Sequence, residues 1–220
     1  SAQADYAALT WDREPYLRKL DGMVYGDDPR QGYFDGQAFY HPELKFQVVF
    51  PAGWRTNNGF SAVTGLAEKQ DGLLQLELAG TEPIATQLQT FLAQQGVTAG
   101  ATSKAAVNGL PAVSAQFGAQ LEKGPVKGYI AFITYGGRNY RLLAIATDAQ
   151  FAAYDAPMRS WVRSFRPLTD AARINVRPTR IKIVKLGGPM TVTAFNTRYP
   201  SVIPVDRVAL LNGVAPDATF

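Results

Sequence analysis

Three closely spaced hairpin-type turn signals constrain the fold of this chain more than any other feature. Asn108-Gly109, Lys123-Gly124-Pro125 and Gly136-Gly137 separate runs that are rich in strand-forming residues. Strands joined by such short turns pair with their neighbours in an antiparallel sense. The runs cover residues 98–107, 110–120, 126–134 and 139–147. The sequence therefore predicts an antiparallel sheet in its central part.

Further strands are expected before this region. Residues 44–50 place apolar side chains at every second position, which predicts a strand with one buried face, and Pro51 ends it. Two more strand patterns cover residues 61–68 and 73–78, with Asp71-Gly72 as a hairpin turn between them. This part of the chain therefore predicts an antiparallel meander.

Two segments carry the apolar spacing of helices. Between residues 82 and 95, apolar side chains recur every three or four positions, and Gly96 ends the pattern. A second helix is expected after Asp148, which can act as its N-cap, and Pro157 predicts a kink or break within it. Helices interspersed with antiparallel strands predict an α+β fold, with an antiparallel β-sheet and helices packed against it.

The segments differ enough in pattern to predict three regions. Residues 1–37 form a lead-in, with a short helix near residues 16–23 and a turn-rich run at residues 25–32. Residues 38–168 contain the strands and helices described above and form the α/β sandwich.

Residues 169–220 are expected to hold a basic linker and a small strand, helix, helix module. Its strand is predicted at residues 180–185, and its helices at residues 191–199 and 205–212, the second closed by Gly213. No final strand is visible in the sequence to pair with the first.

Charge is concentrated in this last region. The net charge is +4, and residues 169–220 carry 7 basic against 3 acidic residues. Such an excess can face an anionic polymer, or it can belong to a solvated linker and strand face. The candidate contacts with an anionic polymer are Arg173, Arg177, Arg180, Lys182 and Lys185.

The inventory of reactive residues argues against catalysis by this chain. It has no cysteine and a single histidine, His41, so it cannot assemble a catalytic triad with a cysteine or a multi-histidine metal site. The H-E-x-x-H zinc motif and the glycine-rich phosphate-binding loops are missing. His41 precedes Pro42 at a strand end, which is typical of a structural turn residue. We therefore predict no catalytic residue, no bound metal, no cofactor and no transmembrane segment.

Several segments resemble a known family. Residues 16–32 and 39–44 resemble the segment that follows the peptidase domain in bacterial HtpX-like and BepA-like zinc metallopeptidases, and the resemblance continues through residues 50–54, 108–112 and 164–168. It implies that the chain follows a peptidase domain, that zinc is held only there, and that the protein is periplasmic or associated with the cell envelope. The implied partners are that peptidase domain, other envelope proteins and peptidoglycan.

Two regions also resemble smaller modules. The middle region looks like a PsbP-type sandwich, a fold used for docking rather than chemistry. The last segment resembles a LysM-type module, which implies binding of N-acetylglucosamine-containing glycans at two facing turns. The glycan-binding residues implied by this resemblance are Gly187, Gly188, Pro189, Met190, Thr191, Asn212, Gly213, Val214, Ala215 and Pro216.

Together these observations favour a non-catalytic binding region that serves a cell-envelope metallopeptidase. The alternative is a binding module whose basic tail engages nucleic acid or glycan, although aromatic residues do not alternate with the basic ones as nucleic-acid binding would favour. A hydrolase that uses carboxylates and tyrosines is a third reading.

Overall fold

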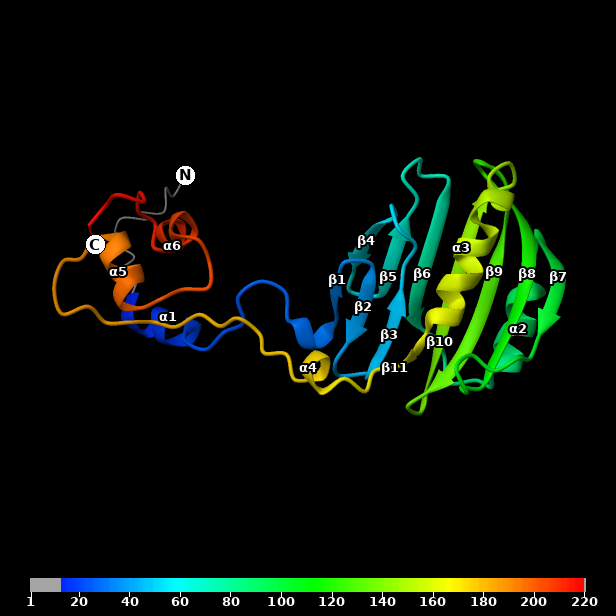
Figure 1. Ribbon diagram of the computed structural model, residues 1–220, viewed down its shortest axis with the longest axis horizontal. Helices are drawn as coiled ribbons and strands as arrows, with labels where there is room; N and C mark the ends of the chain where they lie inside the picture. The colour runs from blue at the N-terminus through cyan, green and yellow to red at the C-terminus, as the bar shows by residue number, and fades with distance from the viewer. Residues whose placement is uncertain (1–12, 220) are drawn as a thin grey trace, which may run out of the picture. The chain divides into compact units, whose positions relative to one another are not determined.

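The computed structural model describes residues 13–219, which form two units. One unit runs from Pro29 to Arg177, and the other combines the residues up to Asp28 with those from Pro178 onward. Figure 1 shows the elements of both units along the chain.

The larger unit contains a seven-stranded antiparallel sheet. Its strand order is β4-β5-β6-β10-β9-β8-β7, so that β4 and β7 form the two edges. The strands are β4 (Arg55–Asn58), β5 (Ala62–Leu66), β6 (Gly72–Leu78), β7 (Val97–Ser103), β8 (Ala112–Leu121), β9 (Gly124–Tyr135) and β10 (Arg138–Thr147).

A second antiparallel sheet of four strands belongs to the same unit, in the order β1-β2-β3-β11. Its pairs include Phe39 with Val48, and Arg166 with Gln47. The strands are β1 (Tyr33–Asp35), β2 (Ala38–His41), β3 (Phe46–Val49) and β11 (Arg166–Pro167), and a short 3-10 helix (Pro29–Gln31) precedes them.

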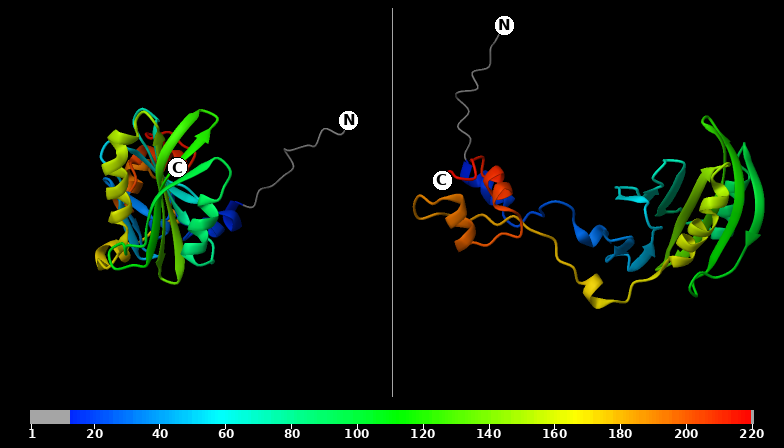
Figure 2. Two further views of the ribbon diagram at one scale, coloured as in Figure 1. Left: turned by 90° about the vertical axis from the view of Figure 1, so that its right-hand side faces the viewer. Right: turned by 45° about the horizontal axis from the view of Figure 1, so that its top comes forward.

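Helices α2 (Ile84–Leu92) and α3 (Phe151–Ser164) lie on opposite faces of the seven-stranded sheet, as Figure 2 shows in its left view. The alternation of side chains along β9 explains this arrangement. Ile130 and Phe132 belong to the cluster under α2, whereas Ala131 and Ile133, which alternate with them, belong to the cluster under α3. These layers confirm the predicted α+β class.

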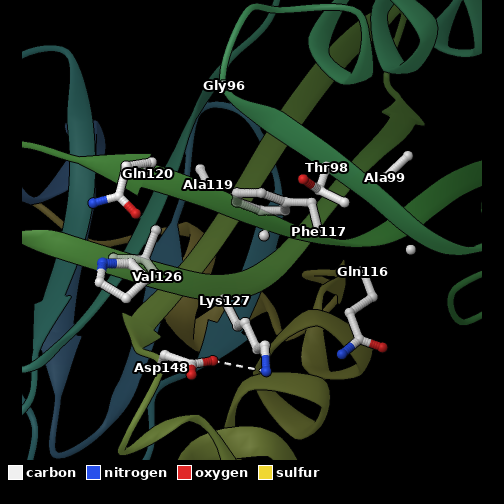
Figure 3. A pocket seen from close by; sticks show the side chains of 13 residues that line it. Gly96, Thr98, Ala99, Gln116, Phe117, Ala119, Gln120, Val126, Lys127 and Asp148 are labelled. Carbon is white, nitrogen blue, oxygen red and sulfur yellow. Dashed lines mark ion pairs between the residues drawn. The ribbon is translucent and has the colours of Figure 1, made fainter.

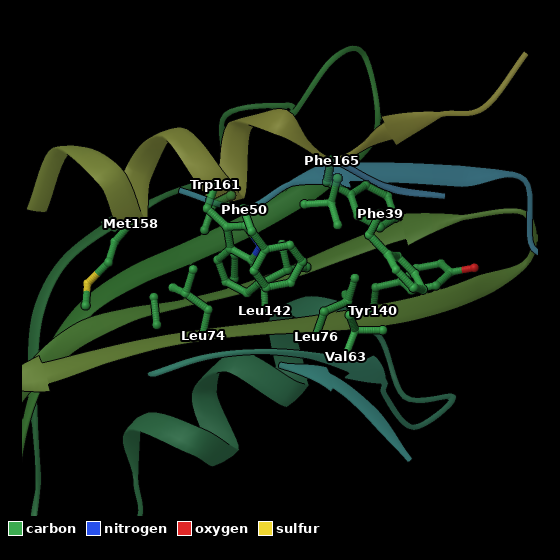
Figure 4. Packing of buried hydrophobic residues seen from close by; sticks show 14 of the residues in the cluster. Phe39, Phe50, Val63, Leu74, Leu76, Tyr140, Leu142, Met158, Trp161 and Phe165 are labelled. Carbon is green, nitrogen blue, oxygen red and sulfur yellow. The ribbon is translucent and has the colours of Figure 1, made fainter. Parts of the chain in front are cut away.

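The larger of the two cores fills the space between the two sheets and α3 (Figure 4). Phe46 stacks on Phe165 with ring centroids 5.1 Å apart, and Phe50 packs on Trp161 at 5.6 Å. Burying each large apolar side chain contributes on the order of 2 kcal/mol. The largest fully buried residues of this core are Trp161, Tyr140, Phe39, Phe50, Phe165, Leu74, Leu76, Ile133, Leu142 and Met158.

The predicted turns adopt the backbone conformation that hairpins require. Asn108 and Gly109 have φ of 49° and 79°, and Gly136 and Gly137 have φ of 57° and 72°. Two successive positive φ values match the type I′ turn, whose twist suits two antiparallel strands. The sequence signals and the structure therefore agree at both places.

Helix α3 differs from expectation at two residues. It runs without interruption through Pro157, because both halves pack against the core, the first through Phe151 and Tyr154 and the second through Met158, Trp161 and Val162. Asp148 does not cap the helix, since Gln150 occupies the N-cap position. The Asp148 carboxylate instead forms an ion pair with Lys127 at 2.7 Å.

The sandwich extends beyond the expected limits of residues 38–168. Phe34 of β1 packs on Phe39 and Phe50, with centroid distances of 5.0 and 5.5 Å, so the lead-in contributes to the core. At the other end, helix α4 (Ala171–Ile174) brings Arg173 to the Asp35 carboxylate at 2.6 Å. The structure therefore places the boundaries at residues 29 and 177.

The smaller unit contains α1 (Arg13–Leu20), α5 (Val192–Arg198) and α6 (Val205–Leu211). Its small core consists of Val192, Val208 and Ala209 with neighbouring apolar residues. The helices at the C-terminal end lie where the sequence predicted them.

The strand predicted at residues 180–185 is wrong. Within residues 13–219 the segment forms no strand, and a single isolated bridge joins Arg180 to Val24. Hydrogen bonds from the turn after α1 hold it, including one from Gly22 N to Ile181 O at 2.8 Å. The segment is therefore hydrogen-bonded to the lead-in, although the sequence predicted the lead-in and this segment as parts of separate regions. A further bridge joins Thr191 to Thr219, where no closing strand was expected.

Candidate binding surface

A hollow of about 590 Å³ lies over the strands β7, β8 and β9 of the larger unit (Figure 3). Its lining comes from these strands, from Gly96 just before β7 and from Asp148, and it includes no residue of α2. Along β8 and β9, the side chains packed under α2 alternate with those on the other face of the sheet, and Gln116 and Lys127 occupy positions on that other face. The hollow therefore lies on the sheet face opposite α2.

Gly118 forms part of the floor of this hollow. It pairs with Thr98 on β7 and with Lys127 on β9, so a row of three residues crosses the hollow with no side chain at its centre. A Cβ atom at Gly118 would meet only the Val126 carbonyl oxygen, at 3.7 Å. The strand itself does not need a glycine there, and a side chain at this position would project into the free space.

The walls of the hollow carry hydrogen-bonding groups. Gln116, Gln120 and Thr98 contribute two amides and a hydroxyl, and Lys127 lies beside its partner Asp148. The Lys127 and Asp148 side chains remain 51% and 46% exposed, so both still meet solvent. This set of donors and acceptors suits a polar ligand.

One edge of the hollow is the open edge of the sheet. Gln120 N donates to Gly96 O at 3.3 Å, which shows that this pair is a hydrogen-bonded one. The main-chain groups of successive residues in a strand point alternately to its two neighbours. The N–H and C=O of Thr98 therefore point toward β8, whereas those of Ala99 point outward, away from the sheet. The register shifts between Ala99 and Thr102, so that Thr102, opposite Ala115, also faces outward. Both residues thus present main-chain groups where the sheet ends.

A polar cluster lies next to the hollow at the start of α3. Tyr129, directly opposite Gln116 on β8, donates a hydrogen bond to Asp155, and Arg159 forms an ion pair with the same carboxylate. Burial raises the pKa of Tyr129 to about 12, and the hydrogen bond to Asp155 adds to the rise. Tyr129 is therefore a neutral hydrogen-bond donor at physiological pH.

The strand aromatics do not form one platform for stacking. Phe132 is buried with the cluster under α2, whereas Tyr140 lies in the opposite core. Tyr129 and Tyr135 pack at the margin of that second core. These aromatic side chains therefore contribute to the cores on the two faces of the sheet.

The predicted glycan-binding residues all lie in the smaller unit. Thr191 caps α5 by accepting a hydrogen bond from Ala194 N at 3.2 Å, and Val192 N donates to Ala218 O at 3.2 Å. The chain after Gly213 thus returns to the start of α5. Val192 at the start of α5 and Val214 after α6 pack in the same small core. Glycan binding at the predicted residues stays a prediction.

The predicted basic contacts are divided between the two units. Arg173 and Arg177 belong to the larger unit, and Arg180, Lys182 and Lys185 belong to the smaller one. Arg173 is committed to Asp35, and its guanidinium lies 4.7 Å from the centroid of the Tyr40 ring. Arg180 donates to the Gly22 carbonyl oxygen. Two of the five cations therefore already have partners within their own units.

His41 has the structural role expected of it. Its Nδ1 accepts a hydrogen bond from Leu44 N at 3.3 Å, and its ring packs 5.3 Å from that of Phe46. Burial lowers the pKa of His41, which favours the neutral ring that this acceptor role requires.

Among residues 13–219, no three or more histidine, cysteine, aspartate or glutamate side chains are grouped as metal ligands. None of the helices in that range has the length and apolar character to span a membrane.

Sequence reasoning missed the hollow and the strand edge beside it. Residues 97–103 read Val-Thr-Ala-Gly-Ala-Thr-Ser, a strand with small uncharged side chains and only one large apolar residue. Such a composition leaves little apolar surface to bury, which indicates a solvent-exposed strand. It was the available signal for this surface.

Comparisons with known proteins gave structural similarities only. No family model matches the chain, and no curated protein matches its sequence. The solution structure of a cyanobacterial PsbP from Synechocystis is 10% identical, with a TM-score of 0.48, and the match covers 60% of this chain and 91% of that one. The crystal structure of LpqN, involved in cell envelope biogenesis in Mycobacterium tuberculosis, is 14% identical, with a TM-score of 0.45, and the match covers 72% and 98% of the two chains.

Proposed function

We propose that this chain is a non-catalytic binding region that docks protein partners or substrates for a bacterial cell-envelope zinc metallopeptidase. The observation that carries the binding role is the hollow over Gly118, which opens beside β7, the edge strand of the sheet, and is walled by amides, a hydroxyl and an exposed ion pair. A surface of this kind, built on a rigid sheet, is suited to recognition by hydrogen bonds.

The metallopeptidase part of the proposal is supported by the resemblance of residues 16–32 and 39–44 to the segment after such a peptidase domain. Under this proposal the zinc is held by that domain, and the present chain works in the periplasm or at the cell envelope.

The test is a peptidase assay on the purified chain with added zinc. Casein and a mixture of unstructured peptides serve as substrates, and zinc binding is measured by calorimetry in parallel. The proposal expects neither hydrolysis nor stoichiometric zinc binding. Zinc-dependent hydrolysis that follows the chain through purification would overturn it.

The smaller unit is proposed to contact cell-wall glycan through residues 187–191 and 212–216. The bridge between Thr191 and Thr219 supports this idea, because it returns the C-terminal segment to the start of α5. Cosedimentation of the chain with purified peptidoglycan tests it, and a chain that stays in the supernatant at low and physiological salt would contradict it.

A further inference from the structure

The edge of β7 is chemically matched to another polypeptide backbone. Ala99 and Thr102 both direct an N–H donor and a C=O acceptor away from β8, and β7 is the last strand of the sheet. An extended peptide offers the same donors and acceptors at the spacing of a strand, so that it can add to such an edge.

The usual protection of an edge strand is weak here. Natural sheets guard their edges with charged residues, prolines and bulges. Strand β7 contains neither a charged residue nor a proline, and its only such device is the register shift between Ala99 and Thr102. Ala99 and Gly100 are both exposed, and because one carries only a methyl group and the other no side chain, they leave room for an approaching strand.

The hollow adds a place for one side chain of the added segment. Neighbouring strands lie about 4.8 Å apart, so Gly118 is roughly 10 Å from a strand that pairs with β7. A long polar side chain would span most of that distance by lying over Thr98 and pointing toward Gly118. It would thus enter the hollow from the β7 side, where the Gln116 and Gln120 side chains of β8 can reach toward it.

We propose that β7 binds an extended segment of a partner polypeptide by strand addition, and that a long polar side chain of this segment occupies the hollow over Gly118. The inference rests on the proposed binding function and names its ligand and the mode of binding.

The experiment selects ligands from a library of displayed random dodecapeptides with the whole chain as bait. Affinities of the selected peptides are then measured for the wild type and for Ala99→Pro, Ala99→Thr and Gly118→Val. Proline at position 99 removes an outward N–H and leaves the bonds between β7 and β8, since edge strands tolerate proline in that orientation. Threonine at the same position keeps the N–H and is the matched control.

The proposal expects Ala99→Pro to weaken binding by roughly tenfold or more, and Ala99→Thr to stay within about threefold of the wild type. Gly118→Val should weaken binding most for peptides that carry a long polar side chain. A peptide N-methylated at the residue that pairs with Ala99 should lose affinity for the unmodified protein, a readout that does not depend on the folding of any variant.

Three results would overturn the proposal: no selected peptide, equal affinity for the wild type and Ala99→Pro, or a dimer of the chain itself that Ala99→Pro dissociates, since a second copy would then be the segment added to β7. Equal affinity would still leave the chain a peptide-binding region and thus spare the proposed function. Zinc-dependent cleavage of the selected peptides would instead remove the proposed function, whatever the effect of Ala99→Pro.

Discussion

The side-chain amide of Asn108 donates a hydrogen bond to the main-chain carbonyl of Phe165 at 2.8 Å, which ties the hairpin before β8 to the end of α3. The same nitrogen donates to the Arg163 carbonyl at 2.7 Å. Carbonyls at a helix C-terminus have no partner within the helix, so Asn108 satisfies two of them. One turn residue therefore both shapes a hairpin and closes a helix.

Replacement of Asn108 by glycine should destabilise the chain by about 2 kcal/mol, because two hydrogen bonds are lost. Glycine tolerates the positive φ of 49° at this position, so the change isolates the side-chain contacts from backbone strain. Thermal unfolding should show a melting temperature lower by roughly 4–8 °C. An unchanged melting temperature would mean that the two bonds contribute nothing.

The turn at Asn108 also shows what the sequence could predict. Asn-Gly, Gly-Gly and the alternation of apolar residues are local signals, and the strands and hairpins they predicted from residue 97 to residue 147 are present. The helices at residues 84–92 and 151–164 follow from apolar spacing in the same way.

Features set by distant contacts were not predictable from local patterns. Strand β1 is only three residues long, and it is held by the packing of Phe34 on Phe39 and Phe50. The pairing of the lead-in with residues 179–183 joins segments more than 150 positions apart. The hollow over Gly118 depends on three strands meeting in one register, which no short motif encodes.

A fragment of residues 29–177 should fold by itself with the stability of its unit in the whole chain, because both sheets and both cores lie within it. A fragment of residues 38–168 should be markedly less stable, since it lacks Phe34 and the ion pair between Asp35 and Arg173. Urea unfolding of both fragments measures the difference. Equal stability would contradict the boundaries at residues 29 and 177.

Alanine at Gly128 and alanine at Gly118 should have opposite outcomes. A Cβ atom at Gly128 would overlap the main-chain oxygen of Ala144 on the neighbouring strand, which can move only with the sheet. We expect Gly128→Ala to cost about 3 kcal/mol or more, or to prevent folding. Gly118→Ala should change the free energy of unfolding by less than about 1 kcal/mol. Similar costs for both substitutions would contradict the register of β9 and β10.

The pKa of His41 should lie below its ordinary value of 6.5, mainly because the ring is buried. A lowered pKa means that the unfolded chain binds the proton more strongly than the folded chain. The contribution of His41 to stability is therefore present above about pH 6.5 and is lost as the pH falls through the folded-state pKa. Because the chain has one histidine, a proton NMR titration follows a single imidazole. A pKa at or above 6.5 would show that the ring is not buried as described.

The outward direction of the Ala99 amide supports the docking account most directly, and amide hydrogen exchange measures it. In the free chain, the Ala99 amide should exchange fast, whereas the Thr98 amide, which faces β8, should be protected. Addition of a selected peptide should slow exchange at Ala99 and Thr102 and leave Thr98 unchanged. Binding of the peptide with no added protection at Ala99 and Thr102 would contradict the account.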